Sequence, residues 1–355
     1  MTLVCVPKEE SVTFVGWYKV NGNTMELLST DLSYTYTMTN YDTIIRAKFL
    51  LYKYVEGTNN KVIEYGFYPQ SEVTDDTIIS ELSTKIGDLP DIENDNNWTN
   101  YNYYDNNSIS NYMWYKDIDL DNDGVKDYRA IYFIKYRTTR TTLNAVASNS
   151  NVDDNGYELN KVYYFKFEPV LWDILDTTVY GDTIIMSRFI IDAQNWYINT
   201  ANRIDGLNTI YPNNYEQSSI KSWLNNDFYY TVFDLYRQKN NSLNLTDNSV
   251  ESTGKTTNDY ALDGIYSDKV YLLSVAEFNN YIKNTNLAKA TSTDYAKIQG
   301  LNVSTSGTTT GYSNYWTRSP QTTSTNATSI TNSSSTSTQS ISYVYGIRPL
   351  LDMFL

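Results

Sequence analysis

From residue 61 to residue 355, helix-like and strand-like patterns follow one another without regular alternation. A doubly wound sheet requires strands and helices in strict succession, whereas irregular succession is typical of an α+β domain. We therefore predict an α+β domain with short helices and much irregular loop. Helices are expected at residues 75–86, 220–232, 274–282 and 292–299, and strands at residues 128–136, 162–175, 184–191, 270–273 and 343–351.

Capping signals mark the predicted helix starts. Thr74 is the expected N-cap of the first helix, and the carboxylates of Asp75 and Asp76 suit its positive N-terminus. Ser274 and Glu277 have the spacing of a capping box, in which each side chain bonds the other residue's backbone N–H. Both signals favour short helices that begin at defined residues.

A long polar segment lies close to the end of the chain. Residues 321–342 are almost wholly Ser, Thr, Asn and Gln, which bury too little apolar area to order themselves. Strongly apolar blocks flank the segment on both sides. We therefore expect a surface loop or a polar edge hairpin.

Residues 1–54 predict a small all-β unit. Strand-like runs at 12–18, 34–38 and 43–49 are separated by turn residues such as those at 21–23. The runs FVGWY at 14–18 and AKF at 47–49, with residues 28–30 and 34–38 between them, resemble the second half of an internalin-type B repeat. That resemblance implies a partial β-grasp-like stalk module, with the first strand of the repeat missing and the chain the C-terminal piece of a longer protein. A free-standing β-hairpin decoration is the alternative.

Short distinctive blocks follow one another in a fixed order from residue 61 to residue 355. The blocks are YGFYPQS (65–71), WYKDI (114–118), YRAIYF (128–133), FKFEPVLW (165–172), IIDAQ (190–194), SSIKSWLN (218–225), DKVYLLS (268–274), DYAK (294–297), YWTRSP (315–320) and GIRP (346–349). Together they resemble the DUF6273 family, found in Firmicutes and Mollicutes, often on long surface proteins. This resemblance implies a C-type-lectin-like domain over residues 61–355, of the variant found in formylglycine-generating enzymes.

The composition excludes several kinds of chemistry. The chain has no histidine and a single cysteine, Cys5, so Ser-His-Asp and Cys-His triads and His-ligated zinc are excluded. Formylglycine-generating enzymes act through cysteine, which residues 61–355 lack, so that activity is not expected here. A net charge of −14, from 27 basic and 41 acidic residues, argues against nucleic acid as a partner. No apolar stretch approaches the roughly 20 residues of a membrane-spanning helix, so no membrane insertion is expected of this fragment.

One acidic cluster is a candidate calcium site. Asp119, Asp121, Asp123 and Asp127 place carboxylates at near-alternate positions around Gly124, as in the first part of an EF-hand loop. The twelfth position, where an EF-hand has a bidentate glutamate, is Ala130, and the flanks are strand-like. The more ordinary expectation is therefore a β-hairpin turn with solvated carboxylates. No other cofactor is expected.

Thirty-five tyrosines are present, and two clusters are candidate recognition surfaces because tyrosine is rigid and amphipathic. The alternative is an AT-rich coding bias that raises the tyrosine content everywhere. The candidate ligand-binding residues are Tyr101, Tyr103, Tyr104, Tyr312, Tyr315 and Trp316.

Glu168 is a candidate catalytic carboxylate, with Asp173 or Asp192 as its partner, because carboxylate pairs carry glycoside hydrolysis. The more ordinary expectation pairs Glu168 with Arg318 or Arg348.

Taken together, these patterns favour a non-enzymatic adhesion module displayed outside the cell, on a bacterial surface. Its expected partner is a glycan or protein on a host or bacterial surface. The alternatives are a carboxylate-based enzyme acting on surface polysaccharide and a purely structural spacer.

Overall fold

A computed structural model describes most of the chain. The described residues are 1–6, 13–21, 24–38, 42–59, 61–101, 112–135, 152–177, 182–197, 200–206, 208–238, 241, 244–247 and 265–353. Strands make up 43% of this part and helices 16%, arranged in several sheets. The predicted α+β, C-type-lectin-like fold is therefore wrong. The predicted helices are present at residues 76–83, 219–232, 275–282 and 294–298, but they hold a small share of the described residues, and the polar segment near the end of the chain added strands.

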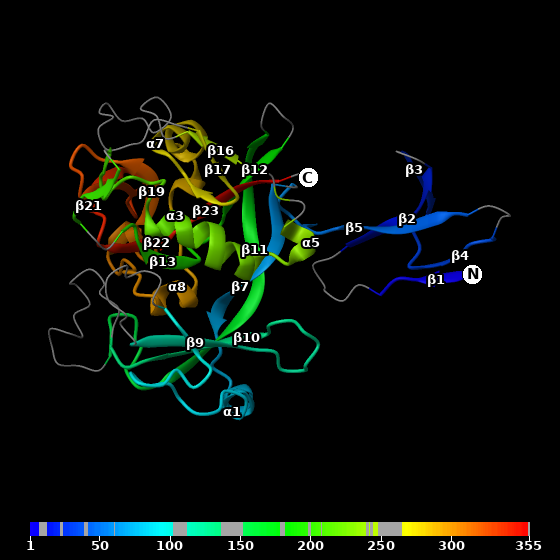
Figure 1. Ribbon diagram of the computed structural model, residues 1–355, viewed down its shortest axis with the longest axis horizontal. Coiled ribbons are helices and arrows are strands. Elements are labelled where there is room, and N and C mark those ends of the chain that lie inside the picture. The colour runs from blue at the N-terminus through cyan, green and yellow to red at the C-terminus, as the bar shows by residue number, and fades with distance from the viewer. Residues whose placement is uncertain are drawn as a thin grey trace.

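The largest sheet is antiparallel and is built around one long strand, β11 (Val162–Thr177), which pairs with β10 (Tyr128–Phe133), β12 (Thr183–Ser187) and β7 (Val62–Glu72) (Figure 1). The run of aromatic and β-branched residues in β11 explains its length, because such side chains fit a pleated surface that is buried in the core. The sheet is completed by β6 (Lys53–Tyr54), β8 (Thr99–Asn100), β9 (Met113–Ile118), β18 (Tyr271–Leu272) and β23 (Pro349–Met353).

A second sheet contains the polar segment. Its strand order is β13 (Asp192–Asn195), β22 (Val344–Ile347), β19 (Tyr315–Pro320), β20 (Asn326–Ile330) and β21 (Thr336–Ser340). Strands β20 and β21 form an antiparallel hairpin with β21 at the edge, so the predicted polar edge hairpin is confirmed. Two further pairs are two-stranded antiparallel sheets: β14 (Arg203–Asp205) with β15 (Asn208–Ile210), and β16 (Asn244–Asp247) with β17 (Ile265–Asp268).

The helices are short, and several continue as π-helical turns. The capping box of Ser274 and Glu277 is confirmed at α7 (Val275–Glu277). Thr74 is not the N-cap of α1 (Asp76–Ser83); Asp75 is, because its carboxylate accepts hydrogen bonds from the N–H groups of Thr77 and Ile78. The remaining helices are α3 (Ser219–Trp223), η2 (Leu224–Phe228), α4 (Tyr229–Val232), α5 (Leu235–Gln238), η3 (Phe278–Ile282), η4 (Asn286–Ala288), α8 (Asp294–Ile298) and η5 (Gly307–Thr309).

One glycine fixes the packing of α4 against the large sheet. Gly66 in β7 has φ +72°, and a Cβ placed there would lie 2.5 Å from Cγ1 of Val232 and 2.8 Å from its carbonyl oxygen. Only glycine tolerates both the left-handed backbone and this close approach. None of the helices in the described residues is long and apolar enough to cross a membrane.

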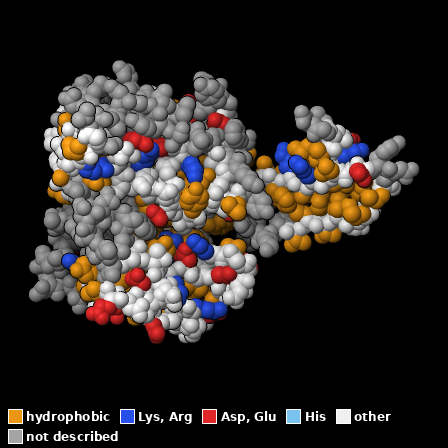
Figure 2. Space-filling model, viewed as in Figure 1, with side chains coloured by type: hydrophobic (Ala, Val, Ile, Leu, Met, Phe, Trp, Pro, Cys, Tyr) orange, Lys and Arg blue, Asp and Glu red, His pale blue; other side chains and the backbone are white. Residues whose placement is uncertain are grey.

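The N-terminal unit projects from the rest of the molecule (Figure 1). Its strands β2 (Thr13–Asn21), β3 (Thr24–Ser29) and β5 (Ile44–Leu50) form a sheet in the order β3-β2-β5, and β1 (Thr2–Val4) pairs with β4 (Ser33–Thr35). The rings of Phe14, Trp17 and Phe49 pack together on this unit. Figure 2 shows hydrophobic side chains gathered on its surface. The unit is therefore all-β in the residues described, with part of its apolar surface facing solvent.

Candidate functional site

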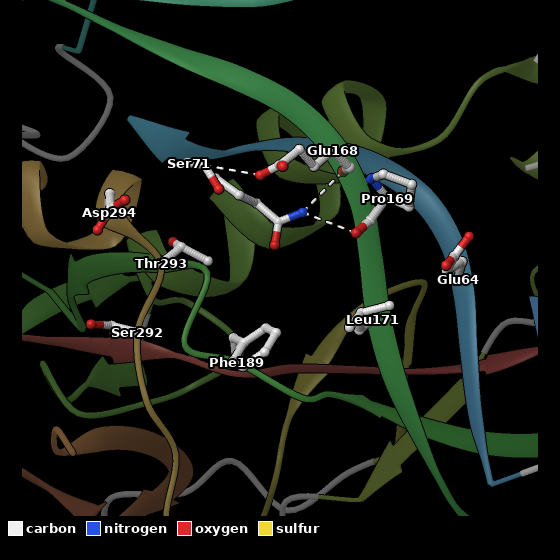
Figure 3. Close-up of a pocket in the computed structure, with 10 residues that line it drawn as sticks. Glu64, Ser71, Glu168, Pro169, Leu171, Phe189, Ser292, Thr293 and Asp294 are labelled. Carbon is white, nitrogen blue, oxygen red and sulfur yellow. Dashed lines mark hydrogen bonds between the residues drawn. The ribbon is translucent and has the colours of Figure 1, made fainter. Parts of the chain in front are cut away.

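A pocket of about 410 Å³ lies where β7 and β11 face the segment before α8 (Figure 3). In Figure 3, Ser71 and Glu168 lie on one side of the space, Thr293 and Asp294 on another, and Phe189 closes a third. This volume is in the range of small-ligand sites. The lining residues are Glu64, Gln70, Ser71, Glu168, Pro169, Leu171, Phe189, Ser292, Thr293 and Asp294.

The first wall is shaped by a proline inside a strand. Pro169 has no N–H to donate, and the pairing of β11 with β7 shifts register between Pro169 and Leu171. The side-chain amide of Gln70 compensates, because its Nε2 donates to the carbonyl oxygens of Glu168 and Pro169, both at 3.0 Å. The Ser71 N–H donates to Oε2 of Glu168 at 3.1 Å. The Glu168 carboxylate is thereby held at the pocket's edge (Figure 3).

The second wall is the start of α8. Thr293 caps this helix by accepting a hydrogen bond from the Ala296 N–H at 3.2 Å. Asp294, the first helical residue, accepts from the Glu72 N–H at 3.3 Å through Oδ2 and from Lys297 Nζ at 2.7 Å through Oδ1. Both oxygens of Asp294 are therefore bonded within the protein. Burial and the nearby Asp294 raise the pKa of the Glu72 carboxyl group, which lies behind this wall.

The remaining lining divides into an apolar face and hydroxyl groups. Pro169, Leu171 and Phe189 supply apolar contact area, while Ser71 and Ser292 supply hydroxyls. The charged residues that line the pocket are all acidic. Chemically, the site offers hydrogen-bond acceptors and hydroxyls beside a small hydrophobic surface.

The predicted tyrosine surface is not assembled as one exposed face. Tyr101, Tyr315 and Trp316 are buried. The hydroxyl of Tyr101 lies 2.6 Å from that of Tyr295, Tyr315 donates to the carbonyl of Ala288, and Trp316 donates to the carbonyl of Gln194. Half-buried Tyr312 lies under Lys289, whose Nζ is 5.5 Å from the ring centre. Tyr103 and Tyr104 lie outside the described residues.

The predicted acidic loop is the turn of a β-hairpin, since β9 and β10 on either side of it pair antiparallel. Asp119, Asp121 and Asp127 bring carboxylate oxygens within 4.8 Å of one another. All four aspartates also accept hydrogen bonds from backbone N–H groups of the loop, such as that from the Gly124 N–H to Asp119 at 2.8 Å and that from the Val125 N–H to Asp123 at 2.8 Å. Asp117, which precedes the loop, is held by Arg129 at 2.6 Å and by Lys126 at 2.8 Å. Burial raises the pKa of its carboxyl group, but these two cations outweigh burial and lower the pKa below its usual value.

The partners expected for Glu168 lie elsewhere. Asp173 pairs with Arg188 at 2.6 Å, and Asp192 accepts a hydrogen bond from the Tyr68 hydroxyl at 2.5 Å. Arg318 forms a fork with Glu277 at 2.5 and 2.8 Å, whereas Arg348 donates to backbone carbonyls, including that of Ser187. The predicted pairing of Glu168 with Arg318 or Arg348 is therefore wrong, and neither Asp173 nor Asp192 lines the pocket beside Glu168. Asp294 is the carboxylate on the other wall of the pocket, and the local signals that could have drawn attention to it are the helix start predicted at residue 292 and the DYAK block at 294–297.

The family comparison supports part of the sequence interpretation. Residues 180–353 match the family model of a domain of unknown function, DUF6273. The match confirms the resemblance for the second part of the predicted range, and it includes the pocket wall at 292–294 but not the wall at 64–71. No curated protein and no solved structure matches the chain.

Proposed function

We propose that this chain is a non-enzymatic ligand-binding module of a bacterial surface protein, and that the pocket between β7, β11 and the start of α8 takes a glycan. One observation carries the proposal. The pocket sets hydroxyls and carboxylates beside an apolar face, which is the combination that a sugar ring, with its polar edge and apolar face, requires. A volume of about 410 Å³ suits one or two sugar units rather than a protein surface.

The bonding of the carboxylates favours binding over hydrolysis. Both Asp294 oxygens are engaged by Lys297 and the Glu72 N–H, and Oε2 of Glu168 is engaged by the Ser71 N–H. A glycosidase needs one carboxylic acid to donate a proton and a second carboxylate to attack or activate water. A carboxylate whose two oxygens are already bonded within the protein is poorly placed for either role.

The proposed location at the cell surface comes from the N-terminal unit. Its strands at 13–21, 33–35 and 44–50 coincide with the residues that resemble an internalin-type B repeat, a stalk module. A stalk that precedes the domain containing the pocket would hold this domain away from the cell, where the pocket can reach glycans on a host or bacterial surface. Whether residues 1–54 and 61–355 are separate domains stays a prediction.

A glycan array with the fluorescently labelled chain tests the proposed function. We expect binding to a defined subset of glycans, and loss of that binding in Phe189→Ala, which removes the aromatic part of the apolar face. The matched control is Tyr230→Ala, an exposed aromatic outside the pocket. Absence of binding to every glycan, or equal binding by Phe189→Ala and the intact chain, would overturn the proposal.

The second candidate function is a carboxylate-based enzyme on surface polysaccharide. It is favoured by a single observation: Glu168 and Asp294 line the same pocket from different walls. Turnover of oligosaccharides that disappears in Glu168→Gln would establish it. A purely structural spacer, the third hypothesis, gives no role to the pocket.

We also propose a structural calcium ion in the turn between β9 and β10. Asp119, Asp121 and Asp127 would hold it, since ligand oxygens on opposite sides of Ca²⁺ lie about 5 Å apart and theirs are within 4.8 Å. The ion would remove the repulsion among these carboxylates and brace the hairpin. In thermal melts, 1 mM calcium at about 100 times its Kd should stabilise the chain by about 2.7 kcal/mol. Equal melting temperatures in calcium and in chelator would contradict the proposal.

A further inference from the structure

The charged residues that line the pocket all carry negative charge. Its ionisable lining residues are Glu64, Glu168 and Asp294, and the lining includes neither lysine nor arginine. Lys297 neutralises Asp294 through an ion pair of 2.7 Å. Among the described residues, neither Glu64 nor Glu168 forms an ion pair, although Lys53 lies opposite Glu64 in the β6–β7 register. Two negative charges therefore remain uncompensated around the cavity.

Glu168 is the better placed of these two carboxylates. It is half-buried at the pocket's edge, and the Ser71 N–H occupies one of its oxygens. The second oxygen has no hydrogen-bond partner among the described residues. A partly desolvated carboxylate attracts a cation more strongly than an exposed one, because water screens the pair less. The fixed position of Glu168 also removes part of the entropic cost of forming such a contact.

The groups that surround Glu168 indicate which kind of positively charged ligand the pocket would bind. The hydroxyl of Ser71 neighbours Glu168, and Phe189 and Leu171 supply apolar area across the same cavity (Figure 3). A bare metal ion would not use the apolar face, and a simple alkylamine would not use the hydroxyls. A sugar that bears an ammonium group uses both.

We infer that the ligand is an amino sugar with a free amine, whose ammonium group binds Glu168 while its ring packs on the apolar face. The inference rests on the proposed glycan function and makes it more specific. It requires that an amine, rather than an acetamido or hydroxyl group, be the preferred substituent on the sugar. It also requires that the preference be electrostatic and depend on Glu168.

The test compares three trisaccharides of one stereochemistry that differ only in the substituent at carbon 2: glucosamine trimer, its N-acetylated form and cellotriose. Calorimetric titration should give about tenfold tighter binding for the free amine, equivalent to one charge-assisted contact. The preference should fall in about 0.5 M salt, where the Debye length is only a few ångströms. Glu168→Gln keeps an acceptor for the Ser71 N–H and should reduce the ratio to near one. Glu93→Gln, an equal charge change at an exposed site, should retain the full ratio.

The outcomes separate the inference from the proposed function. Binding of all three sugars with equal affinity would overturn the amine inference and leave glycan binding intact. Absence of binding to any of them, together with a blank glycan array, would overturn both. A lysine-containing peptide that binds as tightly as the glucosamine trimer, and competes with it, would overturn the assignment to a sugar.

Discussion

Replacement of the buried Asp352 by asparagine should stabilise this protein at neutral pH. Asp352 lies in β23 and is 5% exposed, and one of its oxygens accepts a hydrogen bond from the Tyr271 hydroxyl at 2.8 Å. Burial, with a further contribution from Asp182, raises the pKa of the Asp352 carboxyl group to about 6, although the hydrogen bond from Tyr271 opposes the shift. The substitution Asp352→Asn retains an acceptor for the Tyr271 hydroxyl and removes only the charge, so it isolates the cost of burying that charge.

The magnitude follows from the difference between the folded and unfolded states. An unfolded aspartate has a pKa of about 3.9, so a folded pKa of about 6 is a shift of about two units. At about 1.4 kcal/mol per unit, ionised Asp352 costs about 3 kcal/mol of stability above pH 6. The folded chain binds the extra proton between pH 4 and pH 6, so this part of the stability falls as the pH rises through that window. Below pH 4 both states are protonated and the cost is absent.

Urea denaturation followed by tryptophan fluorescence measures the effect. We expect Asp352→Asn to raise the free energy of unfolding by about 1 to 3 kcal/mol at pH 7.5 and by less than about 0.5 kcal/mol at pH 4. Asp88→Asn, at an exposed position, is the matched control and should change neither value. A gain that is equal at both pH values, or a loss at pH 7.5, would refute the reasoning.

Two further predictions concern packing and buried charge. Gly66→Ala should destabilise the chain by about 2 kcal/mol or more, because its methyl group would lie 2.5 Å from Val232 on a left-handed backbone; a urea midpoint like that of the intact chain would contradict this. Glu277→Ala should cost about 3 kcal/mol, since it leaves the guanidinium of Arg318, whose side chain is 2% exposed, without its carboxylate partner. Calorimetry of this variant beside Glu93→Ala, an exposed control, would show no difference if the fork were unimportant.

Features that depend on neighbours in the chain could be predicted from the sequence. The capping box of Ser274 and Glu277 needs only a spacing of three residues, and the turn around Gly124 needs only a local run of turn residues between two strands. The polar edge hairpin was one of two predicted forms of the segment 321–342, since a segment rich in Ser and Thr can pair at the edge of a sheet; the burial of its few apolar residues, Ala327, Ile330 and Ile341, in the core was not predicted. The one-residue error at Asp75 arose because threonine and aspartate are both good N-caps.

The sequence did not reveal whether a given aromatic side chain faces the core or the solvent. Trp316 and Tyr315 were expected on a recognition surface, yet both are buried and bonded to distant carbonyls. A tyrosine can place its ring in the core and still satisfy its hydroxyl there, so its amphipathic character does not reveal which way it faces. The extents of the helices at 219–232 and 275–282 could be predicted from the spacing of their apolar residues, but the π-helical turns within them could not.

The sequence by itself determined the local elements, the exclusion of histidine and cysteine chemistry in residues 61–355, and the family resemblance now confirmed for residues 180–353. The tertiary structure alone decided the pocket. The Glu72 N–H and Asp294, which join its two walls, are 222 residues apart, and Gln70 and Glu168 are 98 residues apart. Such contacts arise from the order in which strands pair, and pairing is fixed by the burial of whole faces rather than by any local motif.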